Sequence, residues 1–476
     1  MICFLSASVI LCSQTLKDYQ TRILSEVKLD GEGIKAGLLA DRRRLSKRTR
    51  FRLGPEAGSG PMGYNPHPMR ILLLNQAFVS PNEPGHTRHF EMAKFLQARG
   101  HDLVIVASDL NYQTGQRTVA RRGVFDEQVI DGVRILRAYI YPALHRSYFW
   151  RILSFFSFMF SSVWTGLQVR DVDLVMGTTP PIFQAVSAWF VSWVRRKPFL
   201  LEVRDLWPEF GVSMGVLTNP VLIALGRWLE KFLYARAAHI LVNSPAYKEY
   251  MLGKGVPEKK VTFIPYGTDV DMFTPQVDGS LVRVGLGLEN KFVVLYAGAL
   301  GQANDIDTIL RAAERLKDAD KIHFVLFGDG KERPRLQSQA EKMKLTNVLF
   351  AGVRAKKEMP GVVAAADVCL AILQDIPMFR TTYPNKVFDY MAAGRATVLV
   401  IDGVSRQLIE ASNGGVFVQP GDAEALAKAL LELSQAPGRV RQMGTDAREY
   451  LVRHLDRRDR LNETLELLTR LAGGKH

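Results

Sequence analysis

Cysteine is scarce in this 476-residue sequence, which contains only Cys3, Cys12 and Cys369. None of them has the paired spacing of a zinc site, and three residues do not make a disulfide framework. The scarcity argues against a disulfide-stabilised secreted class. It favours a reducing compartment, the cytoplasm.

Long hydrophobic runs are also absent. No segment has the 18 or so uninterrupted apolar residues of a membrane-spanning helix. The apolar start, residues 1–12, lacks a basic segment and a small-residue cleavage site, so a signal peptide is not expected. Tyr148–Leu167 has eight aromatic residues and one charge, Arg151, but is interrupted by serines. We expect it to lie in the plane of a membrane interface or, alternatively, to be a buried helix of the first domain.

Several binding signatures are missing too. The turn after the first expected strand, residues 75–88, contains Gly85 but no G-x-G-x-x-G, which disfavours a dehydrogenase. There is no basic recognition helix, zinc-finger spacing or RNA-binding aromatic signature, so nucleic acid is not an expected partner. No Asp-x-Asp motif stands at an expected site position; Asp171–Asp173 precedes a buried strand and is taken as structural. We therefore expect no metal and no cofactor.

The composition is that of an ordinary globular protein, with 47% hydrophobic and 23% charged residues. The length is too great for one core and suits two domains. The net charge of +14 favours anionic partners such as phosphorylated ligands or an anionic membrane surface.

Residues 1–68 do not read as part of the fold. They hold 11 Lys and Arg against 6 Asp and Glu, and a basic run is followed by a stretch rich in glycine and proline. We expect a disordered lead or a mis-assigned start, with Met62 or Met69 as the true first residue. The alternative is a basic tail that touches lipid.

From Met69 onward, short apolar runs alternate with helical stretches. This pattern predicts parallel strands joined by helical crossovers, and it pauses near residues 271–290 before restarting. We predict an α/β protein with two doubly wound, Rossmann-like parallel-sheet domains that face a central cleft, at residues 69–280 and 281–455. A C-terminal helix within 456–476 is expected to pack back on the first domain. The predicted strands are 71–74, 103–107, 133–138, 174–177, 199–203, 240–242 and 261–264, then 292–297, 324–328, 348–351, 368–372, 398–401 and 416–419.

Two polar segments follow predicted strands, where ligands of such sheets bind. In the first domain Arg204, Asp205 and Glu209 crowd the end of a buried strand; the alternative interpretation is a structural Arg–Asp pair. In the second domain, Gly328 and Asp329 belong to a Gly-Asp-Gly turn, which is a weak signal by itself.

The stretch 378–395 of the second domain is the richest in candidate residues. Asn385 is predicted to cap a helix that ends at Gly394. Arg380, Lys386 and the helix N-terminus are predicted to form an anion site, and Asp389 could accept hydrogen bonds from two neighbouring hydroxyls. A diphosphate next to a ribose fits this arrangement. The alternative is a basic solvated loop with a helix cap.

These segments, taken together, resemble the retaining glycosyltransferases of family four, which have the GT-B fold. The resemblance is to the bacterial branch that builds O-antigen lipopolysaccharide, capsule and exopolysaccharide, and within it to N-acetylfucosaminyl transferases. It covers residues 69 to about 433. The matching segments are GHTRHFEMAKFLQARG (85–100), TTPPIFQA (178–185), LEVRDLWPE (201–209), YAGALGQANDID (296–307), FGDGKERPRL (327–336) and FRTTYPNKVFDYMAAGR (379–395).

The resemblance implies a hexosyltransferase-like enzyme. It would move a sugar with retention from a nucleotide-sugar donor, UDP-linked in our expectation, to a lipid-linked saccharide or glycan acceptor, and it would work in the cytoplasm at the inner face of the plasma membrane. Fixed cations and a helix N-terminus, rather than a metal, would stabilise the leaving diphosphate. The resemblance places Gly85, Arg380 and Lys386 at the donor diphosphate and Asp389 at the donor ribose. Together with the candidates named above, the expected donor-side residues are Gly85, Gly328, Asp329, Asn385 and Asp389; the expected catalytic residues are Arg380, Lys386 and Asp205; the expected acceptor-side residues are Arg204 and Glu209.

The sequence departs from the family pattern at two places. Thr381 stands where the family has the first of two glutamates, and Asp389 replaces the second. The Arg/Lys pair of the family is missing from segment 296–307. These departures leave open a non-catalytic, transferase-like scaffold for polysaccharide assembly. A nucleotide-sugar epimerase on a similar fold is a further alternative.

Overall fold

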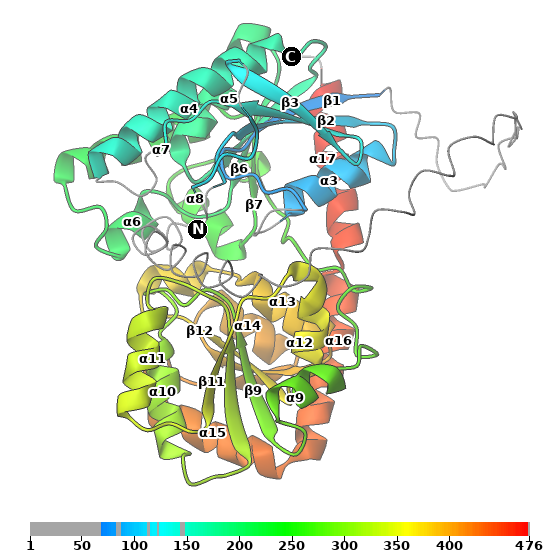
Figure 1. Cartoon of the computed structure of the whole chain (residues 1–476). Helices are drawn as coiled ribbons and strands as arrows, with labels where there is room; N and C mark the ends of the chain where they lie inside the picture. Colours follow the sequence, from blue (N-terminus) through cyan, green and yellow to red (C-terminus); the bar gives the residue numbers. More distant parts are fainter. Residues whose placement is uncertain (1–67, 82–86, 112–114, 121–122, 143–147, 475–476) are drawn as a thin grey trace, which may run out of the picture. The chain divides into compact units, whose positions relative to one another are not determined.

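The computed structural model describes residues 68–81, 87–111, 115–120, 123–142 and 148–474. The expected lead, residues 1–67, and the candidate Gly85 lie outside the described residues. The described chain folds into two α/β domains, each built on its own sheet (Figure 1). The fold class predicted from the sequence is confirmed.

The first domain contains an eight-stranded sheet in the order β3-β4-β2-β1-β5-β6-β7-β8. Apolar side chains from both faces of its central strands are buried, as parallel strands covered by helices require. The strands are β1 (Arg70–Leu74), β2 (Asp102–Ser108), β3 (Phe125–Ile130), β4 (Val133–Ala138), β5 (Leu174–Thr179), β6 (Phe199–Val203), β7 (His239–Val242) and β8 (Val261–Phe263).

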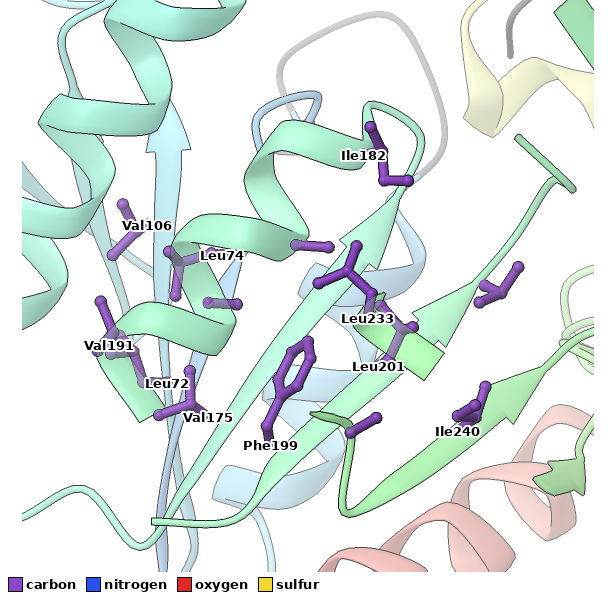
Figure 2. Packing of buried hydrophobic residues seen from close by; sticks show 14 of the residues in the cluster. Leu72, Leu74, Val106, Val175, Ile182, Val191, Phe199, Leu201, Leu233 and Ile240 are labelled. Atoms are coloured by element: carbon purple, nitrogen blue, oxygen red, sulfur yellow. The ribbon is translucent and has the colours of Figure 1, made fainter. Parts of the chain in front are cut away.

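Helices cover both faces of this sheet. One face packs against α4, α5, α7 and α8, and Figure 2 shows Val191 of α5 beside Leu72 and Val175 of the strands, with Ile182 at the other end of the same helix. The other face packs against α3 and the C-terminal helix α17. The helices of this domain are α3 (Arg88–Gln97), α4 (Tyr148–Gln168), α5 (Ile182–Arg195), α6 (Glu209–Ser213), α7 (Pro220–Arg236) and α8 (Pro245–Gly253), with the short 3-10 turn η1 (Glu258–Lys260).

The edge of the first sheet differs from the prediction. β3 was not predicted, and it pairs antiparallel with β4 through a tight turn at Asp131 and Gly132, both of which have positive φ. Its residues are only partly buried, so it has no apolar run to reveal it. An Asp-Gly turn between two β-prone segments is nevertheless a strong hairpin signal, and it could have identified the strand.

The second domain contains a six-stranded, wholly parallel sheet in the order β11-β10-β9-β12-β13-β14. Its strands are β9 (Phe292–Ala297), β10 (Ile322–Phe327), β11 (Val348–Gly352), β12 (Val368–Ile372), β13 (Ala396–Val400) and β14 (Gly415–Phe417). Its helices and 3-10 turns are α9 (Ser280–Leu286), α10 (Ile306–Arg315), α11 (Arg333–Lys342), η2 (Lys356–Glu358), α12 (Met359–Ala364), η3 (Pro377–Thr381), α13 (Asn385–Ala392), α14 (Val404–Ala411), α15 (Ala423–Gln435) and α16 (Pro437–His454).

The chain ends with α17 (Arg457–Gly473), which packs on the first domain. Leu467 and Leu468 are buried in the same apolar cluster as Ile71 and Leu73 of β1. At the start of α17, Asp456 forms an isolated parallel bridge with Thr268, in the segment that follows β8. The last helix therefore covers, together with α3, one face of the first sheet.

Candidate active site

Helix α13 begins after β12 and η3, on the side of the second sheet where the strands end. The prediction that Asn385 caps this helix is wrong: Pro384 is the extended N-cap residue, Asn385 is the first helical residue, and no side chain caps the N-terminus. The helix ends as predicted, with Gly394 at φ 65° directly after the C-cap residue Ala393. The first amides of a helix have no partner inside it, so this N-terminus can bind an anion.

Lys386, in the first turn of α13, is the strongest candidate for such an anion contact. Its Nζ lies 4.1 Å from the centre of the Tyr296 ring, and burial lowers the pKa of the amine to about 7. Within the described residues, no carboxylate forms an ion pair with Lys386. A partly buried amine without a counter-ion indicates a place for an anionic ligand.

Glycine residues bring two loops together beside this amine. Gly298 N donates to Phe327 O at 2.9 Å, and a side chain at Gly298 would collide with Nζ of Lys386. Gly328 has φ 143°, and a Cβ there would overlap the carbonyl of Gly298. The loops after β9 and β10 therefore need glycine at both positions to reach each other near Lys386.

The predicted donor residue Asp329 is the exposed member of the second loop. Its Oδ1 accepts from the Gly330 amide at 2.8 Å, and Oδ2 lies 3.8 Å from Arg333 Nη1. The carboxylate thus shapes its own turn. Donor contacts by Asp329, and equally by Gly328 and Asn385, stay predictions.

Arg380 and Thr381 lie in η3, before α13. The Arg380 guanidinium is exposed and donates from Nη2 to Asp375 Oδ1 at 3.0 Å. The Thr381 hydroxyl donates to the carbonyl of Met378 at 2.6 Å. Where the related family has a glutamate, this chain therefore has a hydroxyl that stabilises the 3-10 turn.

Asp389 lies one turn beyond Lys386, on the same side of α13. Its Oδ1 accepts a hydrogen bond from Thr268 Oγ1 at 2.5 Å. Burial raises the pKa of Asp389 to about 6, against the opposing effects of Thr268, Arg457 and Lys356. The carboxyl is thus an acceptor in a poorly solvated place, which suits a contact with hydroxyl groups.

In the first domain, two of the three predicted residues, Arg204 and Glu209, form hydrogen bonds with other parts of the protein. Arg204 is buried and donates from Nε to Thr179 O at 3.2 Å and from Nη2 to Pro180 O at 3.1 Å, so it holds the loop after β5. Glu209 accepts from Arg227 Nε at 2.8 Å, which ties α6 to α7. Asp205, between them, is partly exposed.

The sequence interpretation missed a buried polar network next to Arg204. Glu202, the next-to-last residue of β6, accepts at Oε2 from His89 Nε2 at 2.9 Å, and His89 Nδ1 lies 2.8 Å from Asn75 Nδ2. Burial lowers the pKa of His89 to about 4, so its imidazole is neutral at neutral pH. Burial raises the pKa of Glu202, but the hydrogen bond from His89 and the positive charges of Arg88 and Arg204 lower it by more, so the carboxylate is ionised. His89 then donates from Nε2 and accepts at Nδ1.

A signal for this network was present in the sequence. A glutamate inside an otherwise apolar strand, Phe199–Val203, is rarely buried without a partner. The carboxylate itself predicted that a polar group from another element would lie beside it.

Two protein-family models match the chain. "Glycosyl transferase 4-like domain" matches residues 85–267, and "Glycosyl transferases group 1" matches residues 291–436. The matches cover most of both α/β domains.

Individual proteins agree with these models. The chain is 24% identical over 410 residues to the "Putative colanic acid biosynthesis glycosyl transferase WcaI" of Escherichia coli, across 83% of this chain and 98% of that protein. It is 26% identical to an alpha-galactosylglucosyldiacylglycerol synthase of Streptococcus pneumoniae, across 47% of this chain and 59% of that protein. Anabaena HepE, solved in complex with UDP, has a TM-score of 0.63 at 18% identity, with 84% of this chain and 100% of that chain covered. The epimerase alternative gains no support from these matches.

Proposed function

Because the chain belongs to the group 1 glycosyltransferases and has the GT-B fold, we propose that it transfers a sugar with retention from a UDP-linked donor to a lipid-linked saccharide. The reaction would serve cell-surface polysaccharide synthesis at the inner face of the plasma membrane. The observation that carries the donor site is Lys386: a partly buried amine without a carboxylate partner among the described residues, at the N-terminus of a helix.

The proposed chemistry needs no bound metal. The bond between the anomeric carbon and the β-phosphate oxygen breaks, and the acceptor hydroxyl oxygen bonds to the same face of that carbon. The departing phosphate oxygen takes the hydroxyl proton. Negative charge grows on the diphosphate, where Lys386 and the amides of α13 stabilise it.

Two further residues complete the proposed donor site. Arg380 is exposed and, within the part of the chain that the structure describes, pairs with Asp375, so its guanidinium can turn to the diphosphate when a donor binds. Asp389 accepts the ribose hydroxyls. Support for the UDP donor comes from HepE, which was solved with UDP and with UDP-glucose.

The lipid-linked acceptor is supported by an exposed aromatic surface on α4, α5 and α7. These three helices pack side by side on one face of the first sheet (Figure 1). Four large aromatic side chains on them are more than half exposed: Phe160 at 69%, Trp164 at 57%, Trp193 at 65% and Trp228 at 60%. Several large exposed aromatic side chains on neighbouring helices are typical of a surface that binds a partner or a membrane.

Ring contacts join the aromatic side chains of α5 and α7 on this surface. The rings of Trp228 and Phe232 lie 5.7 Å apart, Phe232 and Trp189 4.7 Å, and Phe190 and Trp193 5.8 Å. None of the described helices is long and apolar enough to cross a bilayer. Tryptophan and phenylalanine on packed helices favour the interfacial region of a membrane instead.

The charge of the same surface selects an anionic bilayer. The three helices contain five basic residues and a single acidic one, Glu230, which is buried against Lys254. Arg196 and Lys197, which follow α5 a few residues after Trp193 in the chain, are exposed. Basic side chains beside interfacial aromatics are attracted to anionic lipid headgroups.

Activity assays test the transfer. The protein is incubated with UDP-sugars and lipid-linked saccharides, with and without EDTA, and product is followed by mass spectrometry. We expect turnover that survives EDTA and that Lys386→Met reduces, while Lys342→Met, on the exposed face of α11, leaves it unchanged. If the protein binds a donor but forms no product with any pair of UDP-sugar and acceptor, the proposed transferase activity is contradicted and the non-catalytic scaffold is favoured.

Vesicle flotation tests the membrane surface. We expect the wild-type protein to float with vesicles of phosphatidylglycerol and less with phosphatidylcholine alone. Combined replacement of Phe160, Trp193 and Trp228 by serine should abolish flotation. Serine at Leu281 and Val353, which are equally exposed but lie in the second domain, should not. Equal flotation of both variants would refute this surface.

A further inference from the structure

Arg88, the first residue of α3, has a guanidinium with two buried donors for which the described residues supply no acceptor. Its Cζ lies 3.9 Å from the centre of the Tyr266 ring, which fixes the guanidinium on the aromatic face. Its Nε and Nη2 are shielded from solvent, yet neither has a hydrogen-bond partner among the described residues. Leaving buried charged donors unpaired is costly in a folded protein, so the position calls for a ligand.

The neighbouring carboxylate is already used. Glu202 accepts from His89 at Oε2 and from Tyr266 Oη, 3.3 Å away, at Oε1. Arg204 also lies close enough to help lower the pKa of Glu202, and its own guanidinium donates to backbone carbonyls. Arg88 and Arg204 both lie near Glu202, and Asp205 offsets the charge of Arg204, so Arg88 is left as the guanidinium that forms no ion pair with a described carboxylate.

The location is that of a ligand site. Asn75 follows β1, Thr179 ends β5 and Arg204 follows β6, so the cluster lies at the carboxyl ends of central parallel strands. Asn75, which contacts His89, also has a buried Oδ1 that accepts no hydrogen bond from the described residues. An anion with a neighbouring hydroxyl would satisfy both groups.

We propose that Arg88 binds a phosphate group attached to a sugar, in the first domain. A guanidinium binds phosphate through two parallel hydrogen bonds, and the two available donors, Nε and Nη2, lie on one edge of the group. The phosphate belongs either to the acceptor or to the donor diphosphate. The phosphate site itself is independent of the proposed transfer reaction. Only its assignment to the acceptor or to the donor rests on that reaction.

The test compares Arg88→Gln and Arg88→Lys with Arg99→Gln in the full chain. Arg99 is a suitable control because its guanidinium also stacks on an aromatic ring, 3.6 Å from the centre of Phe95, but is exposed. Pyrophosphate and UDP binding are measured by calorimetry, the pyrophosphate series also in the Lys386→Met background to remove the amine of the second domain. Acceptor KM is measured wherever turnover occurs.

We expect Arg88→Gln to weaken phosphate binding about 10- to 100-fold, the usual effect of losing a charged hydrogen bond. Arg88→Lys should retain part of the affinity, and Arg99→Gln all of it. A loss of UDP affinity would assign the phosphate to the donor, and a raised acceptor KM with unchanged UDP affinity would assign it to the acceptor.

The ligand-free melting temperature separates this role from a structural one. Arg88 has no hydrogen-bond acceptor among the described residues, so Arg88→Gln should lower it only through the lost contacts with Tyr266 and Glu202, which Arg88→Lys should partly restore. A lowered melting temperature with pyrophosphate, UDP and acceptor affinities all within twofold of wild type would overturn the proposal. Absence of turnover with every donor would remove the proposed function, while pyrophosphate binding would still decide the role of Arg88.

Discussion

The pH dependence of donor use should report the protonation of Lys386. Burial lowers the pKa of its amine from 10.5 to about 7. Above that pH the protonated fraction falls about tenfold for each unit. The parameter kcat/KM reflects groups of the free enzyme, so its value for the donor should fall about tenfold between pH 8 and pH 9.

Two variants separate this amine from other titrating groups. Lys386→Met should show no such fall and a rate lower by about 10²–10³, the usual effect of removing one charged donor from a developing anion. Lys386→Arg keeps its charge throughout the range, so its profile should also be flat. Its plateau should be low because Gly298 leaves little room for a larger head group.

The measurement is steady-state kinetics from pH 6 to pH 9 with the donor varied at saturating acceptor. Tyr296, the ring against Nζ, does not interfere because burial raises the pKa of its phenol above this range. A wild-type profile that stays flat to pH 9, or a kcat/KM of Lys386→Met within threefold of wild type, would refute the assignment of the diphosphate to this amine.

Three further changes have defined outcomes. Gly328→Ala should lower the free energy of unfolding in urea by about 1–3 kcal/mol because of backbone strain and overlap with Gly298, whereas Gly285→Ala, which meets no neighbouring atoms, should not. Asp389→Ala should raise the donor KM and spare kcat, since a ribose contact is made equally in ground and transition states; a reduced kcat at unchanged KM would oppose this. The pKa of His89 falls from 6.5 to about 4 on folding, so the unfolded state binds more protons in that range, and acidification from pH 6.5 to pH 4 should cost at most about 1.4 kcal/mol per unit. His89→Gln should flatten that dependence, and parallel curves for both proteins would contradict it.

Apolar runs were sufficient to find the parallel strands. A strand buried on both faces reads as a continuous hydrophobic segment, and β12 coincides with the predicted range 368–372. The half-exposed edge strand β3 has no such run, and its Asp-Gly turn was not used. The start of α13 was misplaced by one residue because capping preferences are weak where Pro384 can occupy the same position.

The candidate site was predictable only in outline. Segment 378–395 contained Lys386 and Asp389 next to each other on one helix, because i and i+3 positions share a face whatever the rest of the fold does. The order of residues in the chain does not reveal which of the cations in this segment pairs with a carboxylate. Asp375 pairs with Arg380, while no carboxylate in the described structure pairs with Lys386.

By itself, then, the sequence determined the two-domain α/β class and the glycosyltransferase motifs, since both are local patterns of apolar runs, turns and short polar segments. Only the tertiary structure decided the environment of each charged group. It placed Glu202 against His89, set Asp389 against Thr268, and left Arg88 on Tyr266 with donors that no described residue accepts. These contacts join residues far apart in the chain, and the free-energy cost of burying a charge depends on which groups lie beside it.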